Sequence, residues 1–327
     1  MTGRRISRII NTMQIKDWPD IPFWEEIVKE SNESTFYHTP LWHEIVVNTF
    51  KDYFIATKGF IFEDGKRAVL PFIQTKTGGF FKGERHLKSS VYGYGGIISE
   101  GRLSEAHQNQ IYNYITSMKA SVSIESNPLY EYTLPDCFSR KRDFIHFIPL
   151  DKGEKYIYKH FSKGAKSSLS KAKRKGIIVR TIQKEEELLA YFEIYRDTLK
   201  RWGNATRVTY PEELFLNIFK SAGNAAKIWV AEKDGKIIAV VTIFYWNQIV
   251  NWFHGAALKD YFDCCPNNIL QMEIMKDAIE KNYRYYDLGP SGGIDGVIKF
   301  KESFGAEKRE LMVGHWKYRW KKRDRFV

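Results

Sequence analysis

The segment from Asp287 to Gly305 combines glycines, carboxylates and lysines in a spacing that suits chemistry on an anion or a polarised carbonyl. It reads DLGPSGGIDGVIKFKESFG. Glycine lets the backbone approach a ligand closely, and the amides of Gly289, Gly292 and Gly293 are candidates to bind an anion or a developing oxyanion. The segment contains neither a Walker loop nor a dinucleotide-binding fingerprint. A purely structural turn is the alternative interpretation.

Covalent catalysis and metal chemistry find little support in the rest of the chain. The three cysteines, Cys137, Cys264 and Cys265, are odd in number and lack metal-ligand spacing, so we expect reduced, idle thiols and no metal site. No arrangement of serine, histidine and aspartate indicates an activated nucleophile. His254, at the end of a predicted strand, is a secondary candidate for a general base, although a lone histidine is more often structural.

Positive charge gathers between Lys159 and Arg180, a stretch without a single acidic residue. We expect a polyanion-binding face here, because a ligand carrying phosphates would relieve the repulsion between neighbouring cations. A solvated helix face is the alternative. The tail 317–325 interleaves aromatic and basic residues, which suits nucleic acid as well as a frayed terminus. The formal net charge of +12 also favours an anionic partner. The candidate cations are Lys163, Lys166, Lys171, Lys173, Arg174 and Lys175.

Two similar segments predict β-hairpins, one in each half of the chain. Residues 59–73 and 228–241 each contain an apolar run, an Asp-Gly pair and a second apolar run, and Asp-Gly favours a tight two-residue turn. Their separation is about half the chain, which favours a duplicated domain over chance similarity. Residues 249–255 predict a third strand and hence an antiparallel meander in the second half.

Helices flank these strands. Asn267 or Asn268 is expected to cap a helix that buries Leu270, Ile274 and Ala278, and a short strand, 285–288, follows it. Upstream, a helix ending at Gly203 should bury Leu188, Phe192, Tyr195, Leu199 and Trp202. In the first half, Thr39 and Pro40 suit the start of a helix through 41–46.

The domain organisation follows from length and composition. With 327 residues and 43% hydrophobic content, the chain predicts a globular α+β protein of two domains, 1–150 and 151–327. The last strand, about 312–327, can return to the first domain. The N-terminus lacks an apolar core of a signal sequence and no run is long enough to span a bilayer, so we expect a cytoplasmic protein.

The run from Trp229 to Gly305 resembles the C-terminal domain of the FemABX family and its acetyltransferase-like relatives. The likeness rests on the hairpin 232–239, His254-Gly255-Ala256, Tyr286-Asp287-Leu288-Gly289 and Phe300-Lys301 with Phe304-Gly305. Residues 162–176, 39–42 and 89–96 are similar to further family segments, which makes Trp42 and Tyr94 substrate-binding candidates. The resemblance implies two tandem GNAT-like domains, each a mixed sheet flanked by helices.

The same resemblance implies transfer of an aminoacyl group from aminoacyl-tRNA to an amine on a peptidoglycan precursor, without a bound cofactor. Phe300 would shape the channel where donor and acceptor meet. Lys301 would stabilise the tetrahedral intermediate or bind the tRNA 3′ end. Asp287 would orient Lys301, take a proton from the amine or cap the glycine loop. Contact with the inner membrane surface is compatible with the charge.

Two alternatives stay open at this point. An acyl-CoA-dependent N-acyltransferase acting on an amino sugar or amino acid would use the same fold, and fold alone does not determine the donor. The usual Arg/Gln-x-x-Gly-x-Gly/Ala signature for the CoA pyrophosphate is absent from the sequence, which favours tRNA. The second alternative is a protein without enzymatic activity that binds RNA or an anionic surface.

Overall fold

The computed structural model describes residues 7–10, 13–76, 85–130, 133–203 and 208–318. The chain forms two compact units: unit 1 comprises residues 1–143 and 310–327, and unit 2 comprises residues 144–309. Strand β10 (Ser139–Pro149) carries the chain from unit 1 into unit 2, and β16 (Glu307–Trp316) carries it back. The basic tail singled out in the sequence lies outside the described residues beyond Tyr318.

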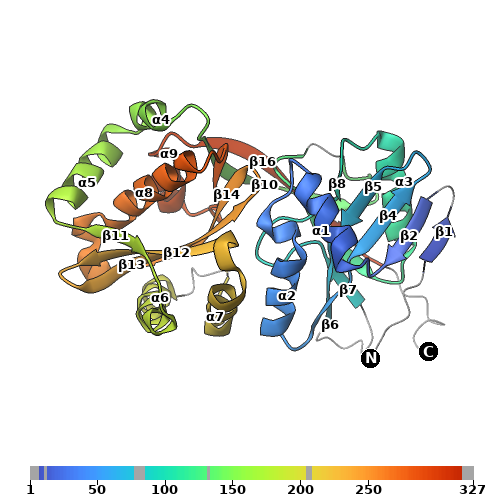
Figure 1. Ribbon diagram of the computed structural model, residues 1–327, viewed down its shortest axis with the longest axis horizontal. Helices are drawn as coiled ribbons and strands as arrows, with labels where there is room; N and C mark the ends of the chain where they lie inside the picture. The colour runs from blue at the N-terminus through green and yellow to red at the C-terminus, as the bar shows by residue number, and fades with distance from the viewer. Residues whose placement is uncertain (1–6, 11–12, 77–84, 131–132, 204–207, 319–327) are drawn as a thin grey trace. The chain divides into compact units, whose positions relative to one another are not determined.

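In its described residues, unit 1 has two groups of hydrogen-bonded strands and the α-helices α1, α2 and α3 (Figure 1). The order is β1-β2-β4-β5-β8 in one group and β16-β9-β7-β6-β3 in the other. An apolar core of aliphatic and aromatic side chains includes Phe60, Phe72 and Tyr112. The elements are β1 (Ser7–Ile10), β2 (Met13–Asp17), α1 (Ile21–Glu30), α2 (Pro40–Thr49), β3 (Tyr53–Ile55), β4 (Lys58–Phe62), β5 (Arg67–Leu70), β6 (Ile73–Lys76), β7 (Arg85–Lys88), β8 (Ile98–Ser99), α3 (Glu105–Ser117) and β9 (Ser121–Glu125).

Local signals in unit 1 behave largely as expected. The hydroxyl of Thr39 accepts the Trp42 N–H at 3.1 Å and Pro40 opens α2, which confirms the predicted helix start. Strands β4 and β5 form the predicted hairpin. Its turn is longer than predicted, because the Phe62 N–H bonds to the Lys66 carbonyl and leaves three loop residues, with Gly65 at φ +82°.

Unit 2 is built on strands in the order β11-β12-β13-β14-β15-β10. The antiparallel meander of β12, β13 and β14 confirms the prediction, and Asp234 and Gly235 form its two-residue turn with positive φ values of 49° and 76°. The elements are α4 (Glu154–His160), α5 (Lys163–Arg174), β11 (Ile178–Thr181), α6 (Leu188–Trp202), α7 (Glu212–Ser221), β12 (Ala226–Lys233), β13 (Lys236–Trp246), β14 (Ile249–Ala257), α8 (Pro266–Glu280), β15 (Tyr285–Pro290) and α9 (Asp295–Glu302).

Helices cover both faces of the unit 2 sheet. Figure 1 shows α4, α5, α8 and α9 on one side of β11, β12 and β13, and α6 and α7 on the other. On the first face, Leu169 of α5 and Leu270, Ile274 and Ala278 of α8 belong to one apolar cluster. The α8 residues are the periodic set read from the sequence, so burial of that face is confirmed.

Two local predictions in unit 2 were wrong in part. Helix α8 begins at Pro266 rather than after Asn267 or Asn268; Cys265, at φ +54°, occupies the N-cap position without a side-chain cap. A proline at the first helical position explains this start, since its fixed φ already matches the helix. In α6 the buried face runs through Leu188, Tyr191, Ile194, Tyr195 and Thr198, while Trp202 is 41% exposed. Gly203, at φ +50°, does end the helix as predicted.

Candidate functional site

The parallel pairing of β14 with β15 ends well before either strand does. Its register joins Ile249 to Tyr285 and finally Asn251 to Asp287, although β14 runs on to Ala257 and β15 to Pro290. We call the region beyond this last pair the β14/β15 opening. Backbone N–H and C=O groups that no longer pair with the neighbouring strand need other hydrogen-bond partners. Such an opening is therefore a place where a ligand can form hydrogen bonds.

Asp287 and Asn251 form a buried polar pair at the start of the opening. The Asn251 Nδ2 donates to Asp287 Oδ2 at 3.0 Å, and the Gly289 N–H donates to Asp287 Oδ1 at 2.6 Å. The Asn251 Oδ1 is buried and has no hydrogen-bond partner among the described residues. Asp287 therefore caps the glycine segment, one of the roles the sequence left open, and the Gly289 amide is committed to that carboxylate rather than to a ligand.

Lys301 lies in the last turn of α9 with its side chain buried, being 3% exposed. Its Nζ donates to the carbonyl oxygens of Gly289 and Pro290, at 2.8 Å each, and lies 5.7 Å from the centre of the Trp252 ring. Both carbonyls belong to the end of β15. The lysine thus places a cation at the β14/β15 opening and also fastens α9 to the strand.

Phe300 and Phe304 continue the aromatic packing around Trp252. The Phe300 ring packs against Trp252 and Phe304, with centroid separations of 6.2 and 5.0 Å. Phe304 is buried and meets Phe161 at 5.1 Å. Gly305, at φ +74°, leaves so little room that a Cβ there would lie 2.9 Å from the Cβ of His160. The Phe304-Gly305 part of the motif therefore joins α9 to the α4–α5 corner.

Gly292 and Gly293 lie in an exposed turn between β15 and α9. Their φ values of 58° and 75° lie in the left-handed region, which glycine tolerates without strain. The Ile294 N–H closes the turn on the Ser291 carbonyl at 3.0 Å. These two glycines, predicted to bind a ligand, follow Gly289 and Pro290, whose carbonyls bind Lys301, closely in the sequence. In the structure they are exposed on the surface.

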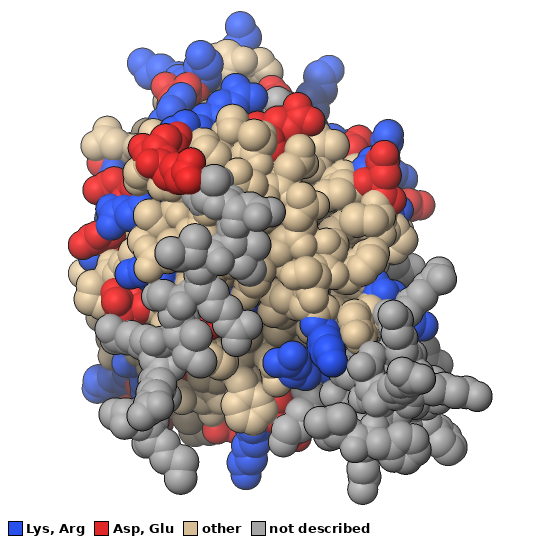
Figure 2. All heavy atoms as spheres, turned by 90° about the vertical axis from the view of Figure 1, so that its right-hand side faces the viewer, with Lys and Arg blue, Asp and Glu red and all other residues tan. Residues whose placement is uncertain are grey.

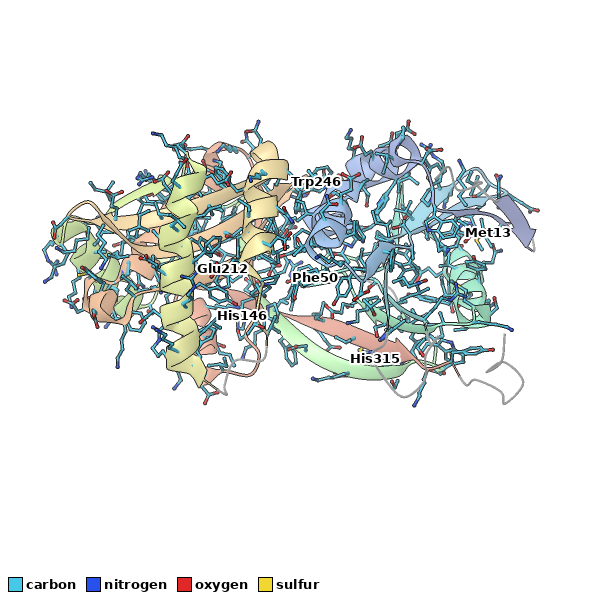
Figure 3. The ribbon with its side chains drawn as sticks, turned by 90° about the horizontal axis from the view of Figure 1, so that it is seen from below. Met13, Phe50, His146, Glu212, Trp246 and His315 are labelled. Carbon is cyan, nitrogen blue, oxygen red and sulfur yellow. The ribbon has the colours of Figure 1, made fainter. Side chains whose placement is uncertain are left out.

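His146 is a polar residue of this region that the sequence reasoning missed. It lies on β10, where Figure 3 labels it, and is 1% exposed. Its Nδ1 is 3.4 Å from the Ser291 Oγ, while its Nε2 is buried without a partner among the described residues. Burial, followed by the charge of Lys301, lowers its pKa. A single histidine inside the apolar run 144–148 was the signal available in the sequence.

His254, the secondary candidate for a base, is enclosed by aromatic rings on the α6–α7 side of the sheet. Its Nδ1 lies 2.6 Å from the Tyr191 hydroxyl, which is also 3.0 Å from Thr242 Oγ1. Rings of Tyr195 and Phe215 lie within 5.2 Å of the imidazole centroid. Burial lowers its pKa to about 3, so the ring is neutral and its hydrogen bonds serve the core.

Helix α5 presents the predicted polyanion-binding cations outward. Ser162 caps it, accepting the Ala165 N–H at 3.0 Å, and Ala165, Leu169 and Ala172 form its buried face. The remaining faces carry the lysines and Arg174, exposed or half-buried. Two of them have local partners: the Lys166 Nζ donates to the Lys159 carbonyl at 2.9 Å, and Lys175 lies 3.8 Å from an Asp263 carboxylate oxygen.

Surface charge on another side of the molecule is mixed. Figure 2 shows Lys and Arg interspersed with Asp and Glu around a broad uncharged area. Alternation of this kind weakens the long-range field of a surface.

Trp42 and Tyr94 lie in unit 1, where both are buried. Each makes an edge contact with the ring of Tyr37, at centroid distances of 5.6 and 5.7 Å. Gly93 permits this packing, since a Cβ there would lie 2.3 Å from the Tyr37 ring. The structure thus brings these two candidates together as part of one aromatic cluster, while Lys301, Phe300 and Asp287 come together in unit 2.

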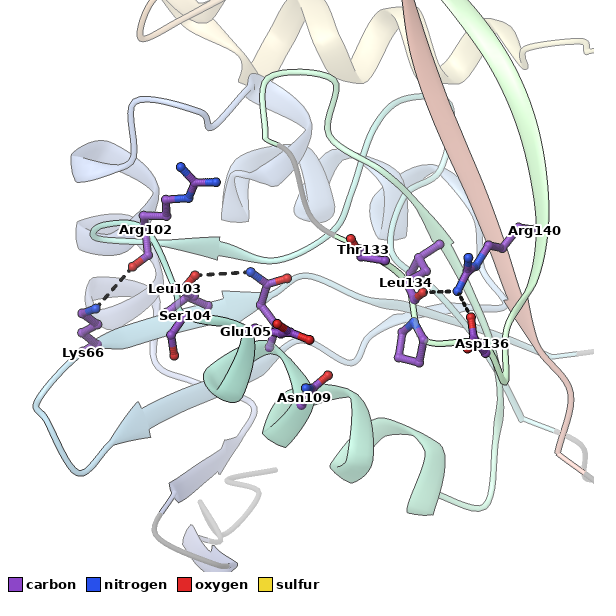
Figure 4. Close-up of a pocket in the computed structure, with 12 residues that line it drawn as sticks. Lys66, Arg102, Leu103, Ser104, Glu105, Asn109, Thr133, Leu134, Asp136 and Arg140 are labelled. Carbon is purple, nitrogen blue, oxygen red and sulfur yellow. Dashed lines mark hydrogen bonds and ion pairs between the residues drawn. The ribbon is translucent and has the colours of Figure 1, made fainter.

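Unit 1 also has an open pocket of about 720 Å³ that holds none of the predicted site residues (Figure 4). The Lys66 Nζ donates to the Arg102 carbonyl at 3.3 Å, and Arg140 pairs with Asp136 at 2.7 Å. Two of the cations that line it, Lys66 and Arg140, are therefore engaged within the wall. Among the described residues, no group of three or more His, Cys, Asp or Glu side chains could hold a metal ion, and no helix is long and apolar enough to cross a membrane.

Comparison with known proteins shows which fold this chain shares. Residues 159–302 match the Acetyltransferase (GNAT) domain family. No curated protein matches the chain in sequence. The crystal structure of FemX superposes with a TM-score of 0.67 at 13% identity, covering 90% of this chain and 96% of FemX.

Two further solved structures match most of the length of this chain. The C-terminal domain of a putative lysylphosphatidylglycerol synthetase from Agrobacterium fabrum gives a TM-score of 0.55 at 13% identity, covering 91% of each chain. A tandem GNAT protein from the clavulanic acid biosynthesis pathway gives 0.52 at 9% identity, covering 91% of this chain and 95% of that one. The chain therefore has the tandem GNAT-like fold of FemX, and its segment 159–302 is similar in sequence to GNAT acetyltransferase domains.

Proposed function

We propose that the chain is an acyltransferase that moves an aminoacyl group from aminoacyl-tRNA to an amine acceptor of the peptidoglycan-precursor class. The observation that carries the proposal is the buried Lys301 cation at the β14/β15 opening, beside the Asp287–Asn251 pair. An aminoacyl ester is already activated, so its transfer needs orientation and charge stabilisation more than a covalent intermediate. Both can be supplied by this set of residues.

Lys301 is suited to stabilise negative charge that develops on the carbonyl oxygen of the donor. Its Nζ is fixed by two carbonyl oxygens and lies near the Trp252 ring, and the side chain is buried. A preorganised cation in a site of low dielectric constant acts on a transition state more strongly than one in water. Binding of the tRNA 3′ end by Lys301 is the second role open to the same charge.

The polar pair supports an aminoacyl donor over a simple acyl donor. Asp287 carries a carboxylate, and the neighbouring Asn251 Oδ1 is a buried acceptor with no partner among the described residues. A buried acceptor without a partner costs about 1–3 kcal/mol, which a donor group on the ligand would recover. The α-ammonium group of an aminoacyl ester is a donor of that kind, and an acetyl group has none.

Helix α5 supports tRNA as the carrier of the donor. Its outward cations, including Lys171, Lys173 and Arg174, lie on the same unit as Lys301. Phosphate contacts of this kind bind nucleic acid with little sequence preference. The Agrobacterium fabrum domain belongs to a putative synthetase whose named product carries a lysyl group, which agrees with aminoacyl transfer. We place the reaction in the cytoplasm, with contact to the inner membrane surface compatible with the basic charge.

An acyl-CoA-dependent N-acyltransferase acting on an amino sugar or amino acid is the second candidate. The match of residues 159–302 to the acetyltransferase domain favours it. Both donors would place a reactive carbonyl at the same opening, and the two candidates differ in what carries it. A protein that binds RNA or an anionic surface without catalysis is the third candidate, favoured by α5 alone.

One experiment separates these candidates. The protein is incubated with charged tRNA or with acyl-CoA, each with a panel of amines that includes a peptidoglycan precursor, an amino sugar and an amino acid, and acyl transfer is followed by mass spectrometry. We expect turnover with charged tRNA. Turnover only with acyl-CoA would replace the aminoacyl proposal by the second candidate.

A donor series then tests the ammonium site. Replacing Asp287 with Asn should slow transfer from an aminoacyl donor by about 10-fold or more, and transfer from its N-acetylated form much less, because the lost carboxylate charge attracts the ammonium group and not the neutral amide. Equal slowing of both donors would argue against recognition of the ammonium group by this pair. Absence of transfer from every donor while RNA binding persists in the unmodified protein would favour the third candidate.

A further inference from the structure

His146 lies opposite an irregularity in the pairing of β10 with β15. Ile145 pairs with Pro290 and Phe147 pairs with Asp287, so β15 uses one more residue than β10 over this interval. Gly289, at φ +70°, lies within the extra length. A bulge bends the strand and changes the direction of nearby side chains, and bulges are frequent beside active sites.

One of the two imidazole nitrogens of His146 has a hydrogen-bond partner among the described residues, and the other has none. Its Nδ1 faces the Ser291 Oγ at 3.4 Å, whereas its Nε2 is buried without a partner among the described residues. If Nδ1 carries the proton and donates to Ser291, then Nε2 holds a lone pair. A lone pair without a partner inside the protein is costly, and a donor group on a ligand would satisfy it.

The surroundings of His146 keep the ring neutral. Burial has the largest effect on its pKa, Lys301 of α9 and Lys308 of β16 lower it further, and Glu302 of α9 opposes them. Ser291 is the polar neighbour on the glycine segment. A histidine with its pKa below the usual value of about 6.5 is unprotonated at neutral pH and can accept a proton.

His146 and Lys301 both attach to the end of β15. Lys301 holds the carbonyls of Gly289 and Pro290, and His146 adjoins Ser291, the next residue. A cation and a neutral base therefore adjoin three consecutive residues, 289–291, at the end of β15. This is the pairing that acyl transfer to an amine requires, since negative charge develops on the carbonyl oxygen while the nucleophile loses a proton.

We propose that the Nε2 of His146 accepts the proton that the acceptor amine releases as it attacks the donor carbonyl; this inference rests on the proposed acyl transfer. The amine nitrogen forms a bond to the carbonyl carbon, and the ester C–O bond, or the C–S bond of a thioester, breaks. The imidazolium then gives the proton to the leaving oxygen or sulfur. The products are an amide and an alcohol or thiol, and the histidine returns to its starting state.

Other titratable groups of unit 2 are less suited to this step. His254 has its Nδ1 bonded to Tyr191 within an aromatic enclosure. His160 lies on the exposed side of α4, with its Nδ1 2.8 Å from the Tyr156 carbonyl. Both oxygens of Asp287 already accept hydrogen bonds, from Asn251 and from the Gly289 amide.

The test compares His146→Gln with the unmodified enzyme, using whichever donor supports turnover. We expect kcat to fall by about 100-fold or more with KM changed by less than about threefold, because the amine still binds while its proton lacks an acceptor. The kcat/KM of the unmodified enzyme should decrease in acid with an inflection below about pH 6.5, and this inflection should disappear in the variant. Added imidazole should restore part of the rate to His146→Ala.

The control is His107→Gln, a histidine substitution on α3 of unit 1, which should leave kcat and the acid inflection unchanged. Thermal unfolding of each variant shows whether it is folded. A folded His146→Gln enzyme that keeps the inflection, or His146→Ala without rescue by imidazole, would overturn the role of His146 while leaving the acyl transfer intact. An unmodified protein that transfers no acyl group from any donor contradicts the proposed function, and this inference falls with it.

Discussion

The Nζ of Lys301 and the carbonyl oxygen of Gly289 lie 2.8 Å apart, in a contact that is closed to solvent. Lys301 therefore has two roles: its hydrogen bonds hold α9 against the end of β15, and its charge lies beside the β14/β15 opening. Experiments on this residue must separate the effect of removing its charge from the effect of releasing the helix.

Replacing Lys301 with Met should lower kcat/KM by about 100-fold or more, because the charge that stabilises an oxyanion is removed while the aliphatic part of the side chain is kept. The free energy of unfolding should also fall by about 1–3 kcal/mol, since the Gly289 and Pro290 carbonyls would then lack their donor. Lys299→Met, on the exposed side of the same helix, is the control and should change neither quantity. Full activity in a destabilised Lys301→Met protein would leave the lysine with a structural role only.

Reversing charge on α5 should weaken RNA binding. Substituting Glu for Lys171, Lys173 and Lys175 should reduce the slope of log affinity against log salt by about one for each phosphate that the variant no longer binds. The control triple variant, with Glu at Lys29, Lys51 and Lys119 of unit 1, changes the net charge by the same amount and should keep the slope. Filter binding or fluorescence anisotropy over a range of salt concentrations measures it. Equal slopes in the two variants would show that α5 does not bind the nucleic acid.

Two glycines near the motif should respond to alanine in opposite ways. Gly305→Ala should destabilise unit 2 by about 1–3 kcal/mol, because φ is +74° and the new Cβ would lie 2.9 Å from His160. Gly296→Ala, on the exposed part of α9 with open space around it, should be neutral or stabilise by up to about 1 kcal/mol. Denaturant unfolding measures both, and a similar effect at the two positions would contradict the close approach of Gly305 to His160.

Acid should destabilise unit 2 through His254. Its pKa is about 3 in the folded protein and about 6.5 in an unfolded chain, so only the unfolded state takes up the proton between these values. Stability therefore decreases as pH falls below about 6.5, by about 1.4 kcal/mol for each unit. From about pH 7 to about pH 5 the free energy of unfolding of the unmodified protein should fall by about 2 kcal/mol more than that of His254→Phe. Urea unfolding at the two pH values tests this, and equal decreases would show that His254 is not buried in its neutral form.

Periodicity and turn chemistry predicted the elements of unit 2 because these signals are local. The two-residue turn at Asp234-Gly235, the end of α6 at Gly203 and the buried face of α8 each depend on a few neighbouring residues. The starts of helices were less predictable. Asn268 suits an N-cap by type, yet the preceding Pro266 had already begun α8, because its ring fixes the first helical dihedral angle.

Composition and pattern led to the segment 287–305, and the resemblance to the FemABX family directed attention to Lys301 and Phe300 within it; the fold gathers both near Asp287 at the end of β15. The sequence could not show that Lys301 is buried in a helix, that the Gly289 amide is taken by Asp287, or that Asn251 lies beside it. These facts depend on the parallel pairing of β14 with β15, in which Asn251 meets a residue 36 positions further along the chain. Rules based on neighbouring residues in the sequence cannot predict a pairing over this distance.

His146 shows the same division most clearly. In the sequence it is one polar residue in an apolar strand, and nothing local distinguishes it from a satisfied core histidine. The tertiary structure decided its surroundings, because the pairing of β10 with β15 brings it to Ser291, which lies 145 positions away in the sequence. The sequence by itself determined which residue types and elements are present; the long-range pairing of strands determined which of them face one another, since hydrogen-bond register and burial arise only when distant segments meet.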